Sequence, residues 1–386
     1  MKNLIKLSFI EYLTDSIKSH PDLIQVIIGP RQVGKTTGVL EYLKTQDSLT
    51  TRYVSADGEV SRPGSWLEEQ WLLLQFDSIG PNGNEGLLVI DEIQKVENWS
   101  ETAKKLWDQQ KRTGTKIKLI LLGSSSLEIQ KGLSESLTGR FKLHTVHHWN
   151  LDESHRGYDL DLEKFLVFGG YPGSYTFIKD KVSWLQYVNE SIVNTVIGRD
   201  ILSLNRVKSP SLFKQTFYLA CSYGAQEISY NKLLGQLQDK GNVELIKHYL
   251  ELFEGAFLLK QLFKYSNKKT LSRSSSPKIL PLAPSLYSIT LDADLNSEHR
   301  GRAFEIAVGC ELIRLPGQLF YWREGPFEVD YVYKFGQNVF AIEVKSNRKR
   351  NQKSLTEFKT KFPGSKTMIV TPDSFSNFIN LIKDEI

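Results

Sequence analysis

The chain has 386 residues, with 49 Lys and Arg against 44 Asp and Glu, 40% hydrophobic residues and two cysteines. That length predicts two or three folded units, and the composition is typical of a globular protein, which excludes disorder throughout. Two cysteines exclude a disulfide framework and a zinc-finger array, and no apolar run reaches the roughly 18–20 residues that cross a bilayer. Near the N-terminus, Glu11 and Asp15 interrupt the apolar core that a signal peptide would need, so we expect a cytoplasmic protein with no membrane partner.

From residue 23 to about residue 149, short apolar runs alternate with amphipathic stretches. This rhythm is typical of an α/β unit with a parallel sheet. We predict strands at 23–28, 51–55, 87–90, 117–122 and 142–147, and helices at 35–43, 66–76, 101–111 and 127–133.

The first predicted strand is followed by GPRQVGKT, which matches the pattern G-x-x-x-x-G-K-[ST] and leads into a helix. Glycines let backbone N–H groups curl around phosphate oxygens, and the start of the helix adds its dipole. We expect Lys35 to reach the β- and γ-phosphates of ATP and Thr36 to bind Mg²⁺. The residues predicted to bind the nucleotide are Gly29, Pro30, Arg31, Gln32, Val33, Gly34, Lys35, Thr36, Thr37 and Asp91.

The third predicted strand ends in two carboxylates, Asp91 and Glu92. In open α/β sheets, ligands bind at the carboxyl ends of the strands. Asp91 would hold Mg²⁺ through water, and Glu92 would polarise the water that attacks the γ-phosphate. A strand that merely ends in an acidic loop is the alternative. The extra strand at 51–55, between the two motifs, favours an ATPase of the additional-strand type over a kinase or a small GTPase.

Two further features downstream can serve hydrolysis. The strand at 117–122 is followed by three serines, Ser124, Ser125 and Ser126, one of which would orient the attacking water or sense the γ-phosphate. Arg140 follows a predicted helix and turn, where a guanidinium would neutralise charge on the γ-phosphate, in cis or from a neighbouring subunit. A surface salt bridge is the alternative role for Arg140.

On these motifs, residues 1–149 resemble AAA+-type P-loop ATPases. The phrases GPRQVGKTT and LLVIDEIQKV resemble a prokaryotic family in which such a core precedes a C-terminal region of unknown function. The likeness continues through residues 168–172 and 199–200 into the tail. It implies that Ser124 or Ser125 is at the first sensor position and that Arg140 is an arginine finger, which would make the protein a homo-oligomer if the finger acts in trans.

The middle of the chain reads as a helical lid region, 150–224, followed by a winged-helix-like region with a linker, 225–275. Helices are expected from residue 228 and over 243–253, with a wing of two short strands at 257–259 and 261–263. In a DNA-binding version the second helix enters the major groove. That helix carries Glu244 and Glu251 beside Lys247, a poor match to a phosphate surface, so structural packing or protein docking stays open.

The tail, 276–386, returns to a mixed α/β pattern. We predict a helix at 301–315 and strands at 319–323, 328–333 and 339–345. Residues 260–386 hold 20 basic and 13 acidic residues, a net charge of +7, against −2 for the rest of the chain. A basic surface of this kind meets phosphates in some proteins and is only solvated in others.

Two neighbouring strands of the tail carry a second set of carboxylates. Asp330 and Glu343 lie thirteen residues apart across a predicted hairpin, and period two aims Glu343 and Lys345 at one face. Such a cluster can bind a divalent metal while the lysine orients or activates water. Glu305, on the preceding helix, would add a third carboxylate as a metal ligand.

This constellation resembles the PD-(D/E)xK nuclease-like fold, an α/β fold of the restriction-endonuclease type. By that resemblance Asp330, Glu343 and Lys345 fill the catalytic motif and Glu305 the helix position, although Val329 stands where the family has proline. A solvated strand face and an inherited but inactive nuclease scaffold are the alternatives. The basic run at 348–350 would track a nucleic-acid backbone or serve only as a solubilising loop.

Taken together, the sequence predicts an Mg²⁺-dependent, ATP-hydrolysing AAA+-type core with an appended nuclease-like domain that acts on or with DNA or RNA. The alternative is a nucleotide-dependent signalling or scaffold protein whose C-terminal domain binds a partner and cuts nothing. A nucleotide kinase lacks support, because we find no second Arg-rich lid for a phosphoryl acceptor.

Overall fold

The computed structural model describes residues 5–58, 61–78, 85–113, 116–123, 129, 132–133, 136–202, 207, 209–237, 241–266, 275–346 and 352–386. It divides into two compact units, Met1–His147 and His148–Ile386. Among the described residues, none of the helices combines the length and the apolar character that a bilayer crossing requires.

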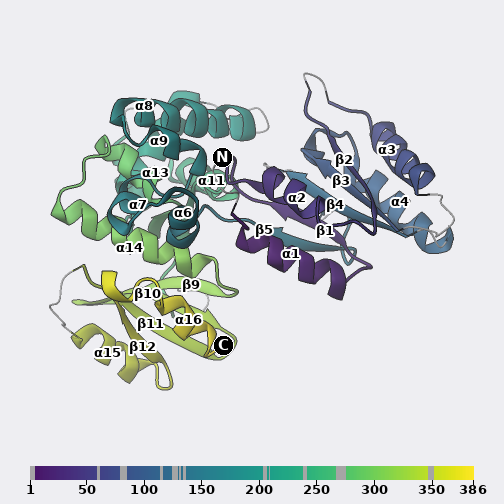
Figure 1. Cartoon of the computed structure of the whole chain (residues 1–386). Helices are drawn as coiled ribbons and strands as arrows, with labels where there is room; N and C mark the ends of the chain where they lie inside the picture. The colour runs from purple at the N-terminus through teal and green to yellow at the C-terminus, as the bar shows by residue number, and fades with distance from the viewer. Residues whose placement is uncertain are drawn as a thin grey trace. The chain divides into compact units, whose positions relative to one another are not determined.

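The first unit is built on a five-stranded sheet in the order β2-β3-β4-β1-β5, with every neighbouring pair parallel (Figure 1). Its elements in chain order are α1 (Ser8–Ser19), β1 (Ile24–Ile28), α2 (Lys35–Leu43), β2 (Thr50–Ser55), α3 (Gly64–Asp77), β3 (Gly86–Asp91), the short turn η1 (Ile93–Lys95), α4 (Trp99–Thr113), β4 (Ile117–Gly123) and β5 (Phe141–Thr145).

The predicted parallel sheet of five strands is confirmed. Strands β1 and β3 are buried along their whole length, as a parallel sheet covered on both faces requires. Strand β4 lies between β1 and β3, so the strand order is that of the additional-strand type. Helix α1 was not among the predicted helices, and the predicted helix at 127–133 falls mostly outside the described residues.

The second unit begins with helices. These are α6 (Leu151–Tyr158), α7 (Leu162–Phe168), the 3₁₀ segment η2 (Pro172–Phe177), α8 (Lys181–Gln186), the wide π-type turns η3 (Tyr187–Val193) and η4 (Val196–Leu202), and α9 (Pro210–Ser222). Side-chain oxygens cap several of their N-termini: Asn150 forms a capping box with Glu153, and Asp161 and Ser209 accept from backbone N–H groups.

A small sheet in the order β6-β8-β7 follows, formed by β6 (Gln226–Glu227), β7 (Leu259–Leu262) and β8 (Lys278–Pro281) beside α10 (Tyr230–Gly235) and α11 (Val243–Gly255). The prediction of two wing strands at 257–259 and 261–263 is wrong, because this stretch contains the single strand β7. Phe257 has φ +59° and closes the turn after α11, so no strand begins there. The partner of β7 is β8, beyond the predicted linker.

The C-terminal part contains a four-stranded sheet in the order β12-β11-β10-β9 (Figure 1). Its elements are α13 (Pro284–Ser288), η5 (Ile289–Leu291), α14 (Ser297–Ile313), β9 (Gln318–Glu324), β10 (Phe327–Phe335), β11 (Asn338–Val344), α15 (Lys353–Lys361), β12 (Lys366–Val370), η6 (Pro372–Ser374) and α16 (Phe378–Lys383). Strands β9, β10 and β11 are antiparallel, and β12 joins β11 in parallel.

Each face of this sheet has its own core. Tyr331 and Ile342 pack with α14 residues such as Phe304 on one face. Val332 packs with the α15 residue Phe358 on the other. The three predicted strands of the tail are present with bounds close to those predicted, whereas β12 and α15 were not predicted.

One buried histidine of the first unit makes its stability depend on pH. His144 on β5 is 9% exposed, and its Nε2 lies 2.8 Å from Oε1 of Gln25 on β1. The same amide oxygen accepts a hydrogen bond from Ser16 on α1. Burial, reinforced by the charge of Lys142, lowers the pKa of His144 to about 4.

Because an unfolded histidine has a pKa near 6.5, the unfolded chain binds the proton that folded His144 refuses. We therefore predict that the thermal midpoint of the first unit falls as the pH drops from 7 towards 4, and that His144→Asn makes this fall shallower. Scanning calorimetry at pH 7 and pH 5 measures it, with the exposed His20→Asn as control. If the thermal midpoint of His144→Asn fell as steeply with pH as that of the wild type, His144 would not be the cause of the pH dependence.

Candidate functional site

The loop between β1 and α2 needs glycine at both ends. A Cβ on Gly29 would lie 2.4 Å from the carbonyl oxygen of Val146, closer than any real contact allows. Gly34 has φ +88° and caps α2 in a left-handed conformation. These two positions keep the loop tight and present its N–H groups at the helix N-terminus, a natural anion site.

Lys35 folds back over this loop. Its Nζ donates to the carbonyl oxygens of Gly29, at 2.9 Å, and Pro30, at 2.6 Å, and the residue is 8% exposed. Its ammonium is therefore held at the mouth of the loop. The other predicted loop residues lie beside it: Arg31 is half-buried, Gln32 and Thr37 are exposed, and Val33 is buried.

The carboxylate of Asp91 ties this loop to the end of β3. Its Oδ2 accepts hydrogen bonds from Thr36 Oγ1 at 2.7 Å and from Tyr53 OH at 2.9 Å. Its Oδ1 accepts from the backbone N–H of Glu92 at 2.9 Å. The two residues predicted to bind Mg²⁺, Thr36 and Asp91, are thus in direct contact although 55 residues separate them in sequence.

Glu92 follows in a conformation that few non-glycine residues adopt, with φ +53°. Its carboxylate accepts a hydrogen bond from the side-chain amide of Gln94, whose own Oε1 is buried with no hydrogen-bond partner among the described residues. Sequence reasoning gave no role to Gln94, which lies within the phrase LLVIDEIQKV but after its two carboxylates, or to Tyr53, which belongs to no motif. Burial and the neighbouring Asp91 raise the pKa of Tyr53, so its hydroxyl stays a donor.

The two hydrolysis features predicted downstream lie in different places. Ser124 and Ser125 fall outside the described residues, but β4 ends at Gly123, between β1 and β3. Arg140 precedes β5, and its carbonyl oxygen accepts from Ile24 N–H at the start of β1. It therefore lies at the amino ends of the strands, whereas the P-loop lies at their carboxyl ends, after β1.

The Arg140 guanidinium pairs with Asp108 on α4. Nε lies 2.9 Å from Oδ1 and Nη2 lies 3.0 Å from Oδ2, a bidentate contact at the surface. The five residues of β1 span about 13–16 Å, more than an arginine side chain reaches. In this structure Arg140 does not reach the loop of its own chain, and the contact observed is a surface salt bridge, the alternative role considered for it.

In the C-terminal sheet, the structure brings the predicted carboxylates together. A bulge between Val329 and Val332 shifts the register of β10 around Asp330. Asp330 Oδ2 accepts from Val344 N–H at 2.7 Å, and Lys345 Nζ lies 2.5 Å from Oε1 of Glu343. The predicted cluster of two carboxylates and one ammonium is therefore present across β10 and β11.

Glu343 is the unusual member of this cluster. It is 7% exposed, and its Oε2 is buried without a hydrogen-bond partner in the described part of the chain. Burial, followed by the charge of Asp330, raises the pKa of Glu343 to about 7. A bound cation is one partner that would satisfy such an oxygen.

Glu305 reaches the cluster from α14 but has a partner that sequence reasoning missed. Lys278 on β8 is 1% exposed, and its Nζ lies 2.5 Å from Glu305 Oε1 and 3.1 Å from the carbonyl oxygen of Asp330. The same ammonium lies 5.0 Å from the centre of the Tyr331 ring. Burial raises the pKa of Glu305 to about 7, against the opposing charge of Lys278.

Within the described ranges, three or more His, Cys, Asp or Glu side chains nowhere converge as a ready-made metal site would require. At this cluster Lys278 takes one oxygen of Glu305, which leaves Asp330 and Glu343 as the two carboxylates best placed for a cation. Few protein ligands suit a metal such as Mg²⁺, which keeps several waters.

Three families match successive parts of the chain. Residues 22–155 match a family described as an AAA domain, residues 159–297 a domain of unknown function (DUF8612), and residues 300–380 another domain of unknown function (DUF4143). The P-loop and Asp91 lie inside the first match, and Asp330 and Glu343 inside the third. The first unit thus contains an AAA-type P-loop ATPase domain.

One related protein and two solved structures are similar to this chain. An uncharacterized protein of Methanocaldococcus jannaschii is 28% identical over 352 residues, 85% of this chain and 76% of that protein. The Walker-type ATPase of Pyrococcus abyssi has a TM-score of 0.50 at 15% identity, over 74% of this chain and 95% of the other. AMPPCP-bound DnaA from Aquifex aeolicus has a TM-score of 0.31 at 15% identity, over 63% and 86%.

Proposed function

We propose that this protein binds ATP with Mg²⁺ at the loop between β1 and α2 and hydrolyses it. The observation that carries the proposal is the 2.7 Å hydrogen bond between Thr36 Oγ1 and Asp91 Oδ2. A hydroxyl and a carboxylate held at that separation beside a phosphate-binding loop are the hard oxygen ligands that Mg²⁺ prefers. The match of residues 22–155 to an AAA domain supports the same assignment.

Each residue of the site has a role in this proposal. The loop N–H groups and Lys35 hold the phosphates, and the bonds from Lys35 to the Gly29 and Pro30 carbonyls exchange for phosphate oxygens on binding. Thr36 and Asp91 would hold the Mg²⁺, which when bound neutralises charge on the phosphates. Glu92 accepts the proton of the attacking water once Gln94 releases its carboxylate.

Two substitutions separate binding from turnover. We predict that Lys35→Ala weakens ATP binding at least about tenfold, because the loop loses its cation. Glu92→Gln should leave binding close to wild type and lower kcat by about 10²–10⁴-fold, because the general base is lost. Isothermal titration with ATP and a phosphate-release assay measure the two effects.

Lys44→Ala is the matched control, since Lys44 follows the same helix and is exposed beside Glu41. It should change neither quantity. Hydrolysis by Glu92→Gln at the wild-type rate would contradict the role of Glu92, and ATP binding by Lys35→Ala at wild-type strength would contradict the site itself.

We propose further that Arg140 acts on the nucleotide of a neighbouring copy. Its place at the amino edge of the sheet supports this, since a second copy could present that edge to the loop. Arg140 would leave Asp108 on assembly and neutralise charge on the transferred phosphate. Ser124 or Ser125, after β4, would sense the γ-phosphate in the same site.

Mixing two inactive variants tests this arrangement. Arg140→Ala should lower turnover by about 10³-fold or more in the assembled protein, as loss of an arginine finger does. A mixture of Arg140→Ala with Glu92→Gln should regain activity, because one interface then pairs an intact Glu92 with an intact Arg140. A mixture no more active than its two components would rule out action in trans.

The C-terminal cluster supports a second candidate activity, metal-dependent cleavage of a phosphodiester. The order of elements α14, β9, β10, β11, α15 and β12, with three antiparallel strands and a parallel fourth, suits the PD-(D/E)xK-like fold. The specific observation in its favour is the buried Oε2 of Glu343, which has no hydrogen-bond partner among the residues that the structure describes. Oxygens of Asp330 and Glu343 would hold a divalent cation, which when bound stabilises charge on the phosphate, while Lys345 orients the attacking water.

We predict that the full chain binds Mn²⁺ and nicks DNA or RNA in its presence, and that Glu343→Gln abolishes both because a ligand charge is lost. ATP hydrolysis should survive this substitution. Titration calorimetry with Mn²⁺ and a nicking assay on plasmid and on RNA measure the two properties.

The matched control is Glu324→Gln, which alters an exposed carboxylate of the same sheet that pairs with Lys361. If the wild type bound Mn²⁺ no better than Glu343→Gln and cut neither polymer, with or without ATP, the nuclease assignment would be wrong.

That outcome would favour the alternative proposal, a nucleotide-dependent scaffold whose C-terminal part binds a partner. The winged-helix-like region of α10, α11, β7 and β8 supports this reading better than it supports DNA binding. Lys247, a cation of α11, lies 2.8 Å from Glu244 on the same helix, so the helix offers little positive charge to a phosphate backbone.

A further inference from the structure

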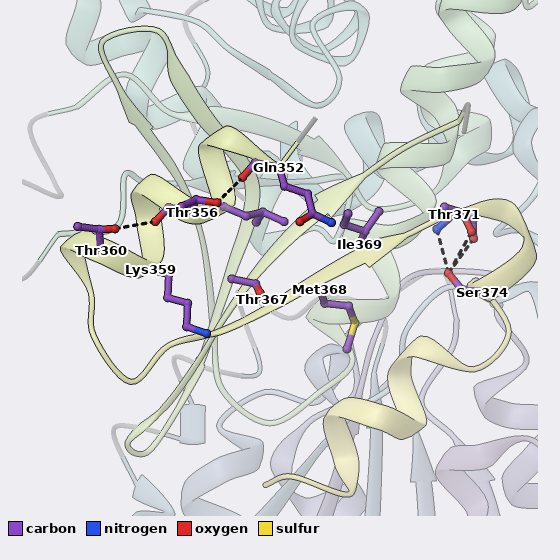
Figure 2. A pocket seen from close by; sticks show the side chains of 10 residues that line it. Gln352, Thr356, Lys359, Thr360, Thr367, Met368, Ile369, Thr371 and Ser374 are labelled. Carbon is purple, nitrogen blue, oxygen red and sulfur yellow. Dashed lines mark hydrogen bonds between the residues drawn. The ribbon is translucent and has the colours of Figure 1, made fainter. Parts of the chain in front are cut away.

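A groove runs between α15 and the edge strand β12 (Figure 2). Its volume is about 720 Å³, and the described residues that line it come from α15 and the preceding Gln352, from β12, and from the turn that follows β12. Residues of the carboxylate cluster do not line it. The groove is therefore a separate candidate site in the C-terminal sheet.

Strand β12 is exposed as a template for another strand. It is the last strand of its sheet in the order β12-β11-β10-β9, so in the described structure only one of its edges meets a neighbouring strand. Its sequence, KTMIV, is rich in strand-forming residues and contains no proline. Five residues of strand extend over roughly 17 Å, enough to pair with a peptide segment of similar length.

Three of the five hydroxyl groups that line the groove donate to backbone carbonyl oxygens. Thr356 Oγ1 donates to the carbonyl of Gln352 and Thr360 Oγ1 to the carbonyl of Thr356, each at 3.0 Å (Figure 2). Ser374 likewise donates to the carbonyl of Thr371. What these side chains offer a ligand is methyl groups and acceptor lone pairs. A phosphate backbone needs several donors and cations, so these three hydroxyl groups do not favour nucleic acid.

Lys359 supplies positive charge to the groove. Figure 2 shows its side chain extending from α15 towards β12, near Thr367. The neighbouring Lys361 and Lys366 pair with Glu324 and Glu385, whereas Lys359 lies within ion-pair distance of no acidic group among the described residues. A single cation in a groove of methyls and acceptors complements one carboxylate of a ligand.

We infer that this groove binds an extended segment of another protein that adds to β12 as a fifth strand. The segment carries an acidic side chain that meets Lys359 and apolar side chains that meet Met368 and Ile369. Backbone hydrogen bonds along the open edge of β12 give the affinity, and the groove selects the side chains. This inference does not depend on the nuclease-like site or on ATP hydrolysis.

Selection from a random library of seven-residue peptides displayed on phage, with the full chain as bait, tests the inference. The enriched sequences should contain an acidic residue and alternating apolar residues. A synthetic peptide of the consensus sequence should protect amides of β12 from hydrogen exchange. Two N-methylated versions of that peptide, one methylated at its odd positions and the other at its even positions, should differ. Only the version whose methyl groups block the hydrogen bonds to β12 should bind about tenfold more weakly.

Lys359→Glu should weaken the consensus peptide about tenfold, and Lys383→Glu, an equal change of charge on α16, should not. Equal thermal midpoints of the two variants confirm that the fold is retained. Enrichment of no peptide that depends on Lys359 would overturn the inference. So would tighter binding of oligo(dT) at the same groove, or burial of β12 in a dimer of the chain seen by ultracentrifugation and hydrogen exchange.

Discussion

The carboxylate of Asp91 is the point on which the first unit depends. It ends a strand that is buried along its whole length, and a buried carboxylate must be satisfied by donors or it destabilises the fold. Thr36, Tyr53 and the N–H of Glu92 supply three hydrogen bonds, and bonds to charged groups contribute about 1.5–3 kcal/mol each. The loop before α2, the strand β2 and the end of β3 are therefore held in one arrangement before any ligand arrives.

The C-terminal cluster is built on the opposite principle. There three carboxylates, Glu305, Asp330 and Glu343, face two ammonium groups, Lys278 and Lys345. Lys278 comes from the strand β8 of the small sheet and satisfies Glu305 internally. The remaining imbalance falls on Glu343, whose Oε2 has no partner among the described residues and whose pKa burial raises to about 7. Both carboxylate oxygens of Asp91 thus have hydrogen-bond donors, whereas one oxygen of Glu343 has none in the described part of the chain.

Most of this could be predicted from the sequence wherever the signal is local. The phosphate-binding loop is contiguous in sequence. The short apolar runs, such as the one that ends at Asp91, predict the parallel sheet. The residues that sequence reasoning missed act across long separations: Tyr53 meets Asp91 from 38 residues away, and Lys278 meets Asp330 from 52. The wing was predicted wrongly for the same reason, since an apolar run next to a helix does not reveal that its partner strand is β8. Strand β12 is short and half-exposed, so its pattern is weak.

Ion pairs in the structure neutralise part of the basic excess that the sequence shows at residues 260–386. Nine of the 20 basic residues in the segment 260–386 lie within ion-pair distance of carboxylates: Lys260, Lys278, Arg300, Arg302, Arg314, Arg323, Lys345, Lys361 and Lys366. Several of the partner acids, such as Glu153 and Glu227, precede the tail in sequence, so a charge count by segment overstates the field. Six more of the basic residues, at 268, 269, 273 and 348–350, lie outside the described residues. Among the described residues of this segment, cations such as Lys359 are therefore isolated, and an isolated cation suits a single carboxylate better than a polyanion.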